Sequence, residues 1–332
     1  MVDFRYHIVS LVAVFLALAV GIILGAGPLQ NSIGDTLSGE VDSLREANGE
    51  LKQVNEQLNN EQKQYTAAFE QLAPSLLAGT LNEQSVALIT FADTSAGDIE
   101  KFQHQLALSG AKINGVFEIQ KDWTDSQSTA YRSSFAEQIK AYVPDAKDVS
   151  DTNTIMALAL NQLVRGGLST EANKTLGELM TAADTVMLKV REGGNEASTA
   201  VVFLSPDTPD LTPKKDTTQD PDKVAQADYD AKTYGALVGT VSAKSPVVLS
   251  GYANSQNDLV TLARTSGIAV STVDSLGGPL GATNTVLAIA AELNEKKVAY
   301  GFADGVDAVV GSRIVVAVPA PAPAESAPAP AA

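Results

Sequence analysis

The first apolar run of the chain is long enough to cross a membrane. Residues 8–24 carry no charged side chain, and the uncharged stretch continues to Gly27. At a rise of ~1.5 Å per residue, a helix over residues 8–27 spans about 30 Å, the thickness of a bilayer core. Signal peptides have a shorter apolar core, and Pro28 would directly follow the best cleavage position. The pattern therefore predicts an uncleaved anchor over residues 8–27, with a cleaved signal or a buried core helix as alternatives.

The charges on either side of this segment predict its orientation. Arg5 is the firm cation before it, and the next Lys or Arg in the chain is Arg45. Cytoplasmic flanks of membrane helices are enriched in these two residue types. We therefore expect residues 1–7 to be cytoplasmic and the bulk of the chain to be periplasmic or extracytoplasmic. This describes a single-pass protein of the inner (plasma) membrane.

A heptad pattern follows over residues 35–73. Leucine recurs at every seventh position, and polar side chains fill most of the positions between. Such a repeat is typical of a coiled coil, which Pro74 is expected to end. The positions expected at its interface are Leu37, Val41, Leu44, Asn48, Leu51, Asn55, Leu58, Gln62 and Tyr65.

Amide side chains interrupt the apolar seam of this repeat. Asn48, Asn55 and Gln62 fall at successive a positions, where a buried asparagine lowers stability, fixes the register and favours two parallel helices. We expect a homodimer or pairing with the coiled coil of another protein. An antiparallel hairpin and a single helix packed on its own domain are the alternatives. In each case the helix would form a stalk of about 54 Å.

Short apolar runs that alternate with helical periodicity occupy residues 83–318. Unbroken apolar runs are typical of parallel strands buried on both faces, and their alternation with helices indicates a doubly wound, mostly parallel α/β domain. Strands are expected at residues 85–91, 111–119, 198–205, 245–251, 268–273, 298–302 and 313–318.

Two segments have the composition of exposed chain. Residues 205–223 contain four prolines and charges of both signs, which predicts a mobile loop. Residues 319–332 consist mainly of Pro and Ala and are expected to be disordered.

The charge and the motif content narrow the function. A formal net charge of −16 argues against nucleic acid as a partner. The absence of cysteine excludes disulfides, thiolate metal sites and cysteine nucleophiles. The sequence also contains no P-loop, no dinucleotide-binding glycine motif, no serine-hydrolase elbow and no zinc-protease motif. We therefore expect a protein that is not an enzyme and has no cofactor.

Two loops after predicted strands are candidate ligand sites. In open α/β sheets, helix N-termini at the carboxyl ends of strands bind anions and small ligands. Ordinary helix capping and turn formation are the alternative explanation for these residues. The candidates are Asp93, Thr94, Ser95, Asp274, Gly277, Gly278 and Gly281.

Three stretches carry a resemblance to a known family. They are RYHIVSLVAVFLALAVGIILGAG at Arg5–Gly27, TVDSLGGPLG at Thr272–Gly281 and YGFADGVDAVV at Tyr300–Val310. Together with the coil and the Pro/Ala tail, they resemble the actinobacterial MctB family (mycobacterial copper transporter B). That family also includes SteB, the membrane partner of SteA, which is linked to cell separation and to control of cell-wall hydrolysis.

The resemblance implies two different functions. A SteB-like protein would be an adaptor in the envelope or in cell division, with a SteA-like membrane partner and the regulatory coiled coil of a hydrolase as partners. An MctB-like protein would transport copper. Copper(I) requires soft ligands, and the sequence offers scattered methionines and two distant histidines, His7 and His104. The residues therefore favour the adaptor, with a copper transport or channel protein as the alternative.

Overall fold

The chain divides into two compact units, Met1–Tyr65 and Thr66–Ala332. The computed structural model describes residues 4–182, 187–208 and 221–317, and within these it leaves out the side chains of residues 26–36. The predicted tail therefore lies outside the described residues. So does most of the predicted mobile loop.

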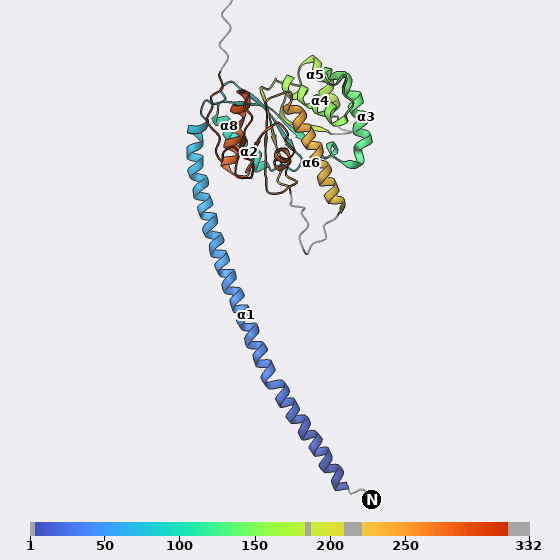
Figure 1. Ribbon diagram of the computed structural model, residues 1–332, viewed down its shortest axis with the longest axis vertical. Helices are drawn as coiled ribbons and strands as arrows, with labels where there is room; N and C mark the ends of the chain where they lie inside the picture. Colours follow the sequence, from blue (N-terminus) through green and yellow to red (C-terminus); the bar gives the residue numbers. More distant parts are fainter. Residues whose placement is uncertain (1–3, 183–186, 209–220, 318–332) are drawn as a thin grey trace, which may run out of the picture. The chain divides into compact units, whose positions relative to one another are not determined.

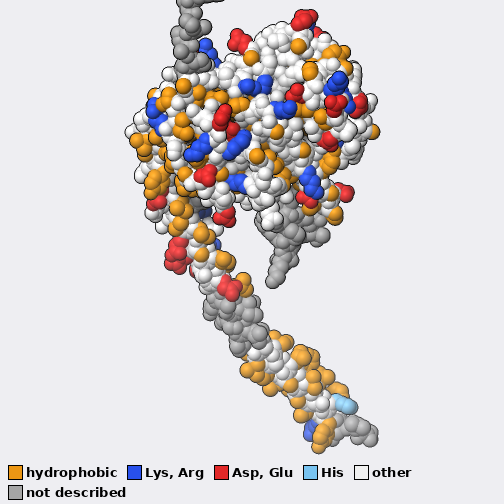
Figure 2. All heavy atoms as spheres, turned by 45° about the horizontal axis from the view of Figure 1, so that its top comes forward, with side chains coloured by type: hydrophobic (Ala, Val, Ile, Leu, Met, Phe, Trp, Pro, Cys, Tyr) orange, Lys and Arg blue, Asp and Glu red, His pale blue; other side chains and the backbone are white. Residues whose placement is uncertain are grey.

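The first unit consists of the N-terminal part of helix α1 (Phe4–Leu77). Within this helix, Phe4–Gly25 is long and apolar enough to cross a membrane, and its side chains are exposed. Apolar side chains cover the face of this segment that is in view in Figure 2. The predicted anchor thus lies within one apolar helical segment.

The heptad region is also helical throughout and contains no turn, so it does not fold back into a hairpin within the chain. The leucines of the repeat are exposed in the single chain, with 70% of Leu51 accessible to solvent. Arg45 bonds to Asp42 of its own helix at 3.2 Å. A coiled coil with a second helix remains a prediction.

Pro74 does not end helix α1, contrary to expectation. The helix continues to Leu77, and the N–H of Ala78 donates to the carbonyl of Pro74 at 2.9 Å. Proline costs the helix one hydrogen bond, but Ala73 and Leu77 are fully buried in the second unit. Burial of these side chains offsets the lost bond.

The second unit is built around a seven-stranded sheet of order β3-β2-β1-β4-β5-β6-β7. Neighbouring strands are parallel except β3, which pairs antiparallel with β2. The strands are β1 (Ser85–Phe91), β2 (Lys112–Ile119), β3 (Leu188–Gly193), β4 (Ala200–Leu204), β5 (Val247–Ser250), β6 (Ser271–Val273) and β7 (Ala299–Tyr300).

Helices cover both faces of this sheet, as Figure 1 shows for α2 and α8 on one side and α3, α4, α5 and α6 on the other. Short 3-10 turns connect some of them. The helices are α2 (Ala96–Leu108), α3 (Thr129–Ile139), α4 (Thr152–Gly166), α5 (Glu171–Met180), α6 (Pro221–Ser242), α7 (Leu259–Thr265) and α8 (Pro279–Leu293). The 3-10 turns are η1 (Lys121–Trp123), η2 (Ser126–Ser128), η3 (Lys140–Tyr142) and η4 (Pro144–Ala146).

Alternate residues of the central strands face two separate cores. In β1, Ile89 packs with helices α3 to α7, whereas Leu88 packs with α2, α8 and the end of α1. In β4, Phe203 and Val202 divide in the same way. Both faces of a central strand must therefore be apolar, which explains the unbroken apolar runs in the sequence.

Three segments differ from the sequence expectation. Strand β3 was not predicted, because LKVREG lies at the edge of the sheet and is largely exposed. Residues 313–317 form no strand, because the backbone N–H of Val316 bonds only to the carbonyl of Thr80 and no ladder develops. Residues 221–223, expected in the loop, begin helix α6.

The strand order changes direction next to β1. The chain moves from β1 to β2 on one side and later returns to β4 on the other side of β1. In open α/β sheets, ligands bind at the carboxyl ends of the two strands that flank such a switch point. The fold therefore directs attention to the space beyond the ends of β1 and β4.

Candidate functional site

A cavity of about 680 Å³ lies at this switch point. Its walls are the ends of β1 and β4, the segment after β2, one face of α6 and the start of α7. Small-molecule sites in proteins commonly have volumes of ~300–1,000 Å³. The cavity is thus the right size for a small ligand, and it lies where this type of sheet binds one.

Two aromatic rings form part of its apolar wall, and a third packs behind them. The rings of Phe91 and Tyr234 meet edge to face with centroids 4.5 Å apart, and the ring of Phe203 lies 6.3 Å from that of Phe91. The Thr124 hydroxyl donates to the Tyr234 hydroxyl at 3.3 Å. Burial raises the pKa of Tyr234 to about 12, so its hydroxyl stays protonated at neutral pH.

The polar part of the wall is acidic. Four aspartates and one lysine contribute to it, which leaves about three negative charges at neutral pH. The Lys121 ammonium lies 3.3 Å from the Asp93 carboxylate, and both side chains are mostly exposed. The other carboxylates belong to Asp125, Asp207 and Asp230.

Hydrogen bonds tie helix α6 to the segment after β2. The side-chain amide of Gln226 donates to the Thr124 carbonyl at 3.0 Å and to the Asp230 carboxylate at 2.6 Å. Arg132, which is 1% exposed, donates to the Tyr229 hydroxyl at 2.6 Å and to the carbonyl of Asp125. These contacts hold two walls of the cavity together.

A buried carboxylate fixes the loops after β4 and β5. Asp258 is fully buried, and it accepts hydrogen bonds from the backbone N–H groups of Thr208, Asn254 and Ser255 at 2.7–2.9 Å. Sequence reasoning missed this residue, because an aspartate before a helix reads as an ordinary cap. Its side chain instead accepts from backbone groups upstream of the helix. It positions the wall and does not point to a ligand by itself.

The structure places the first predicted loop at the cavity. Asp93 is part of the wall. The Thr94 hydroxyl accepts from the N–H of Phe91 and donates to the carbonyl of Leu204, both at 2.9 Å, and so joins the ends of β1 and β4. Ser95 precedes helix α2 at the N-cap position without a capping side-chain bond.

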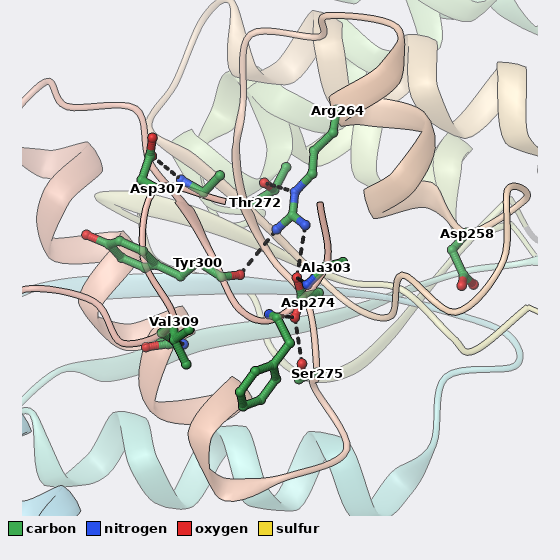
Figure 3. A network of polar contacts seen from close by, with 12 residues as sticks. Asp258, Arg264, Thr272, Asp274, Ser275, Tyr300, Ala303, Asp307 and Val309 are labelled. Carbon is green, nitrogen blue, oxygen red and sulfur yellow. Dashed lines mark hydrogen bonds and ion pairs between the residues drawn. The ribbon is translucent and has the colours of Figure 1, made fainter. Parts of the chain in front are cut away.

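The second predicted loop is held by internal bonds. Asp274 is 2% exposed, and its carboxylate receives the Arg264 guanidinium at 2.9 Å and the Ser275 hydroxyl at 2.5 Å (Figure 3). The N–H groups of Phe302 and Ala303 donate to it at 2.8 and 3.0 Å. Burial alone would raise the pKa of Asp274, but these hydrogen bonds together lower it below its usual value.

The glycines of this loop allow close packing. A Cβ atom on Gly281 would lie 2.1 Å from the Ser275 carbonyl oxygen. The Gly277 carbonyl accepts from the Lys101 ammonium at 2.6 Å, and Gly278 occupies the N-cap position of α8. The two predicted loops follow β1 and β6, which β4 and β5 separate, so their strand ends are ~14 Å apart. Helix α2, which follows the first loop, nevertheless contacts the second loop through the bond between Lys101 and Gly277.

Copper(I) ligands are not gathered in the described part of the chain. No group of three or more His, Cys, Asp or Glu side chains there could hold a metal ion. Met156, Met180 and Met187 are fully buried in an apolar core. His104 is exposed on α2, and His7 directly precedes the predicted anchor. The described residues therefore do not fit a copper(I) site.

Comparison with known proteins gives one family. No curated protein matches the chain. A family model described as "Copper transport outer membrane protein, MctB" matches residues 1–310, from the start of the chain to the last of the three stretches that carried the resemblance. Because this match covers nearly the whole chain, the protein belongs to the MctB family.

Proposed function

We propose that this protein is a non-enzymatic, membrane-anchored adaptor of the cell envelope that forms a parallel dimer through helix α1. The observation that carries the proposal is a row of exposed apolar side chains at heptad spacing on α1. The family and the apolar segment Phe4–Gly25 support association with a membrane. In this arrangement the anchor fixes the chain to the membrane and the heptads pair two chains.

The polar residues of the repeat favour a second copy in parallel orientation. Leu44, Leu51 and Leu58 are all more than half exposed. Asn48 and Asn55 lie between them at a positions, where equivalent asparagines of two parallel chains can bond to each other. An antiparallel pair would oppose each asparagine with a different residue and leave amides unpaired. Parallel pairing is therefore the arrangement in which the asparagine amides can form hydrogen bonds with each other.

The amides at the a positions would also make it easier for α1 to exchange one coiled-coil partner for another. Amides at the a positions lower the stability of a coiled coil, so the pair would open more easily than an all-apolar one. We propose that the partners, as the SteB resemblance implies, are a SteA-like membrane protein and the regulatory coiled coil of a cell-wall hydrolase. Control of cell-wall hydrolysis during division would then act through competition for α1.

Disulfide crosslinking tests the dimer. The chain contains no cysteine, so Leu58→Cys introduces a single thiol at a d position. In a parallel dimer the two thiols face each other, and oxidation of the full chain in detergent should give a covalent dimer. Gln57→Cys, one residue away on an outer position, is the matched control and should crosslink far less. Equal crosslinking of both variants, or none, would overturn the parallel dimer.

Substitution of the asparagines tests the seam. With Asn48 and Asn55 both changed to Leu, the dimer should dissociate at several-fold lower concentration than the unaltered chain in light scattering. An unchanged dissociation constant would mean that these positions are not at an interface.

The proposed topology has the N-terminus in the cytoplasm and one span in the inner membrane. Arg5 on the short flank supports it. The N-terminal sequence of protein extracted from membranes should begin at or next to Met1. A mature chain that begins after Gly25 would make the protein a released one and would refute the anchor.

Copper transport is the second candidate function, because the family description names it. Titration of the purified full chain with Cu(I) separates the two candidates. The buried methionines predict no submicromolar binding by the described residues. Submicromolar affinity would favour copper transport over the adaptor.

A further inference from the structure

We propose that the cavity beyond β1 and β4 binds a small organic cation, one or two ammonium groups on an apolar stem. This inference goes beyond the adaptor function and does not depend on pairing through α1. It assigns the switch point of the sheet a ligand of stated charge.

The apolar surface of the cavity fits the stem. Phe91, Tyr234 and Leu259 contribute large apolar groups, and Ala227 and Ala231 on α6 leave space in front of them. A stem of about six methylene groups fits a volume of about 680 Å³. Removal of the methylene groups from water favours binding and adds to the attraction between the opposite charges.

The charges of the wall fit the ammonium groups. Lys121 is paired with Asp93, so its charge is already balanced. Asp207 receives one amide hydrogen bond from Asn254, and Asp230 receives one from Gln226. A neutral amide donor does not cancel a carboxylate charge, and each carboxylate has about four acceptor sites. Acceptors and negative charge thus remain for a cation.

The same charges disfavour two other classes of ligand, anions and bare metal ions. Sheets of this type often bind phosphate after the first strand, but the net negative charge of this cavity wall disfavours an anion. A bare metal ion needs several carboxylates directed at the same position. Among the described residues, no three such side chains lie close enough to hold a metal ion. An organic cation requires only separate carboxylates around an apolar space.

The position of the single tryptophan provides a direct readout. Trp123 is the one tryptophan of the chain, it is 1% exposed, and it lies between Lys121 and Thr124 of the cavity wall. A ligand in the cavity should therefore change its emission. The measurement uses the full chain in detergent, with 1,6-diaminohexane as the probe and 1,6-hexanediol as its uncharged match.

We expect a saturable change with the diamine and a clearly smaller one with the diol at the same concentrations. Asp230→Asn should raise the dissociation constant of the diamine about tenfold. Asp228→Asn, on the same helix and outside the cavity wall, removes the same charge and should leave it within twofold. Asp207→Asn, on the loop after β4, provides a second test if the first variant does not fold.

Three results would overturn the proposal. They are the absence of saturable diamine binding, an equal response to the diol, and an equal loss of affinity in Asp228→Asn and Asp230→Asn. None of these results bears on crosslinking at position 58, so failure of the cation site and failure of the dimer are distinguishable.

Discussion

In helix α1 up to Tyr65 the large apolar side chains that the structure describes are exposed, whereas in the α/β unit the strands β1, β4 and β5 bury nearly every one of theirs. Tyr65 is 75% accessible, while Leu88 and Phe203 are fully buried. The two units therefore differ in whether their apolar surface is buried within the single chain. The α/β unit buries its apolar surface within the chain, whereas in the proposed function α1 would bury its first part in lipid and its second part against another helix.

The difference has an energetic meaning. Burial of a Leu or Phe side chain contributes ~1.5–3 kcal/mol, and the α/β unit gains this on folding. The exposed leucines of α1 contribute little to the folding of a single chain. Their burial would instead stabilise association with another helix. Substitutions in the two units should therefore affect different measurements.

The largest effect is expected for Asp274→Ala in the α/β unit. The change removes the carboxylate that accepts four hydrogen bonds. It also leaves the Arg264 guanidinium, whose side chain is 10% exposed, without its carboxylate partner. An uncompensated buried charge costs ~3–5 kcal/mol. Urea unfolding followed by Trp123 emission measures the loss in free energy of unfolding.

The same variant tests whether α1 and the α/β unit are independent of each other. Crosslinking through Leu58→Cys should be unchanged by Asp274→Ala under conditions where the α/β unit remains folded. A matched loss of crosslinking would show that the two units depend on each other.

The reciprocal change is Leu51→Ala with Leu58→Ala. Alanine favours a helix at least as well as leucine, so α1 itself should still form. The dimer loses apolar contact at two heptads in each chain and should weaken by about 2–3 kcal/mol. Sedimentation of the full chain in detergent measures the dimer, and urea unfolding of the α/β unit should not change. Ser38→Ala, an exposed position outside the apolar seam, is the control.

A pH effect on stability is expected in the α/β unit. The folded-state pKa of Asp274 is lowered from 3.8, so its bonds stabilise the fold fully above about pH 4. This contribution is lost as the pH falls through 3.8 toward the folded-state pKa, because protons then bind the unfolded chain more readily. Unfolding free energies measured from pH 5 to pH 3 should fall less steeply in Asp274→Asn than in the unaltered chain. Asp148→Asn, at an exposed position, should follow the unaltered chain.

The sequence predicted the parts of the fold whose pattern is strong. The apolar runs at β1, β4 and β5 are buried on both faces, which is why they were recognised. Strand β3 was missed because an exposed edge strand has no such pattern. Residues 313–317 were read as a strand because they are apolar, but a run of apolar residues does not reveal whether a partner strand is present. Burial of Leu77 carries α1 past Pro74, and tertiary burial of this kind has no local signal.

The candidate site was only partly predictable. The loop at Asp93 was identified, because an acidic residue after a buried strand marks the carboxyl end of a sheet. Asp207 and Asp230 reach the same cavity from segments more than 100 residues away, and no spacing in the sequence connects them to Asp93. The order of the strands brings the three together. The acidic character of the cavity favours a cation among the anions and small ligands that such loops can bind.

The smallest effect is expected for Gly49→Ala on α1. Gly49 is at an outer position of the heptads, and a Cβ atom there would meet nothing within 4 Å. Glycine in a helix costs ~0.8–1 kcal/mol relative to alanine, so the change should stabilise α1 by up to that amount. Thermal unfolding followed by circular dichroism at 222 nm should show the helix of α1 persisting to a higher temperature by a few degrees. The transition reported by Trp123 should stay in place, because that residue belongs to the α/β unit. Gly39→Ala, equally open to solvent, should shift the same transition in the same direction. A parallel shift of both transitions would mean that the units unfold together, and the contrast between them would then hold for burial but not for stability.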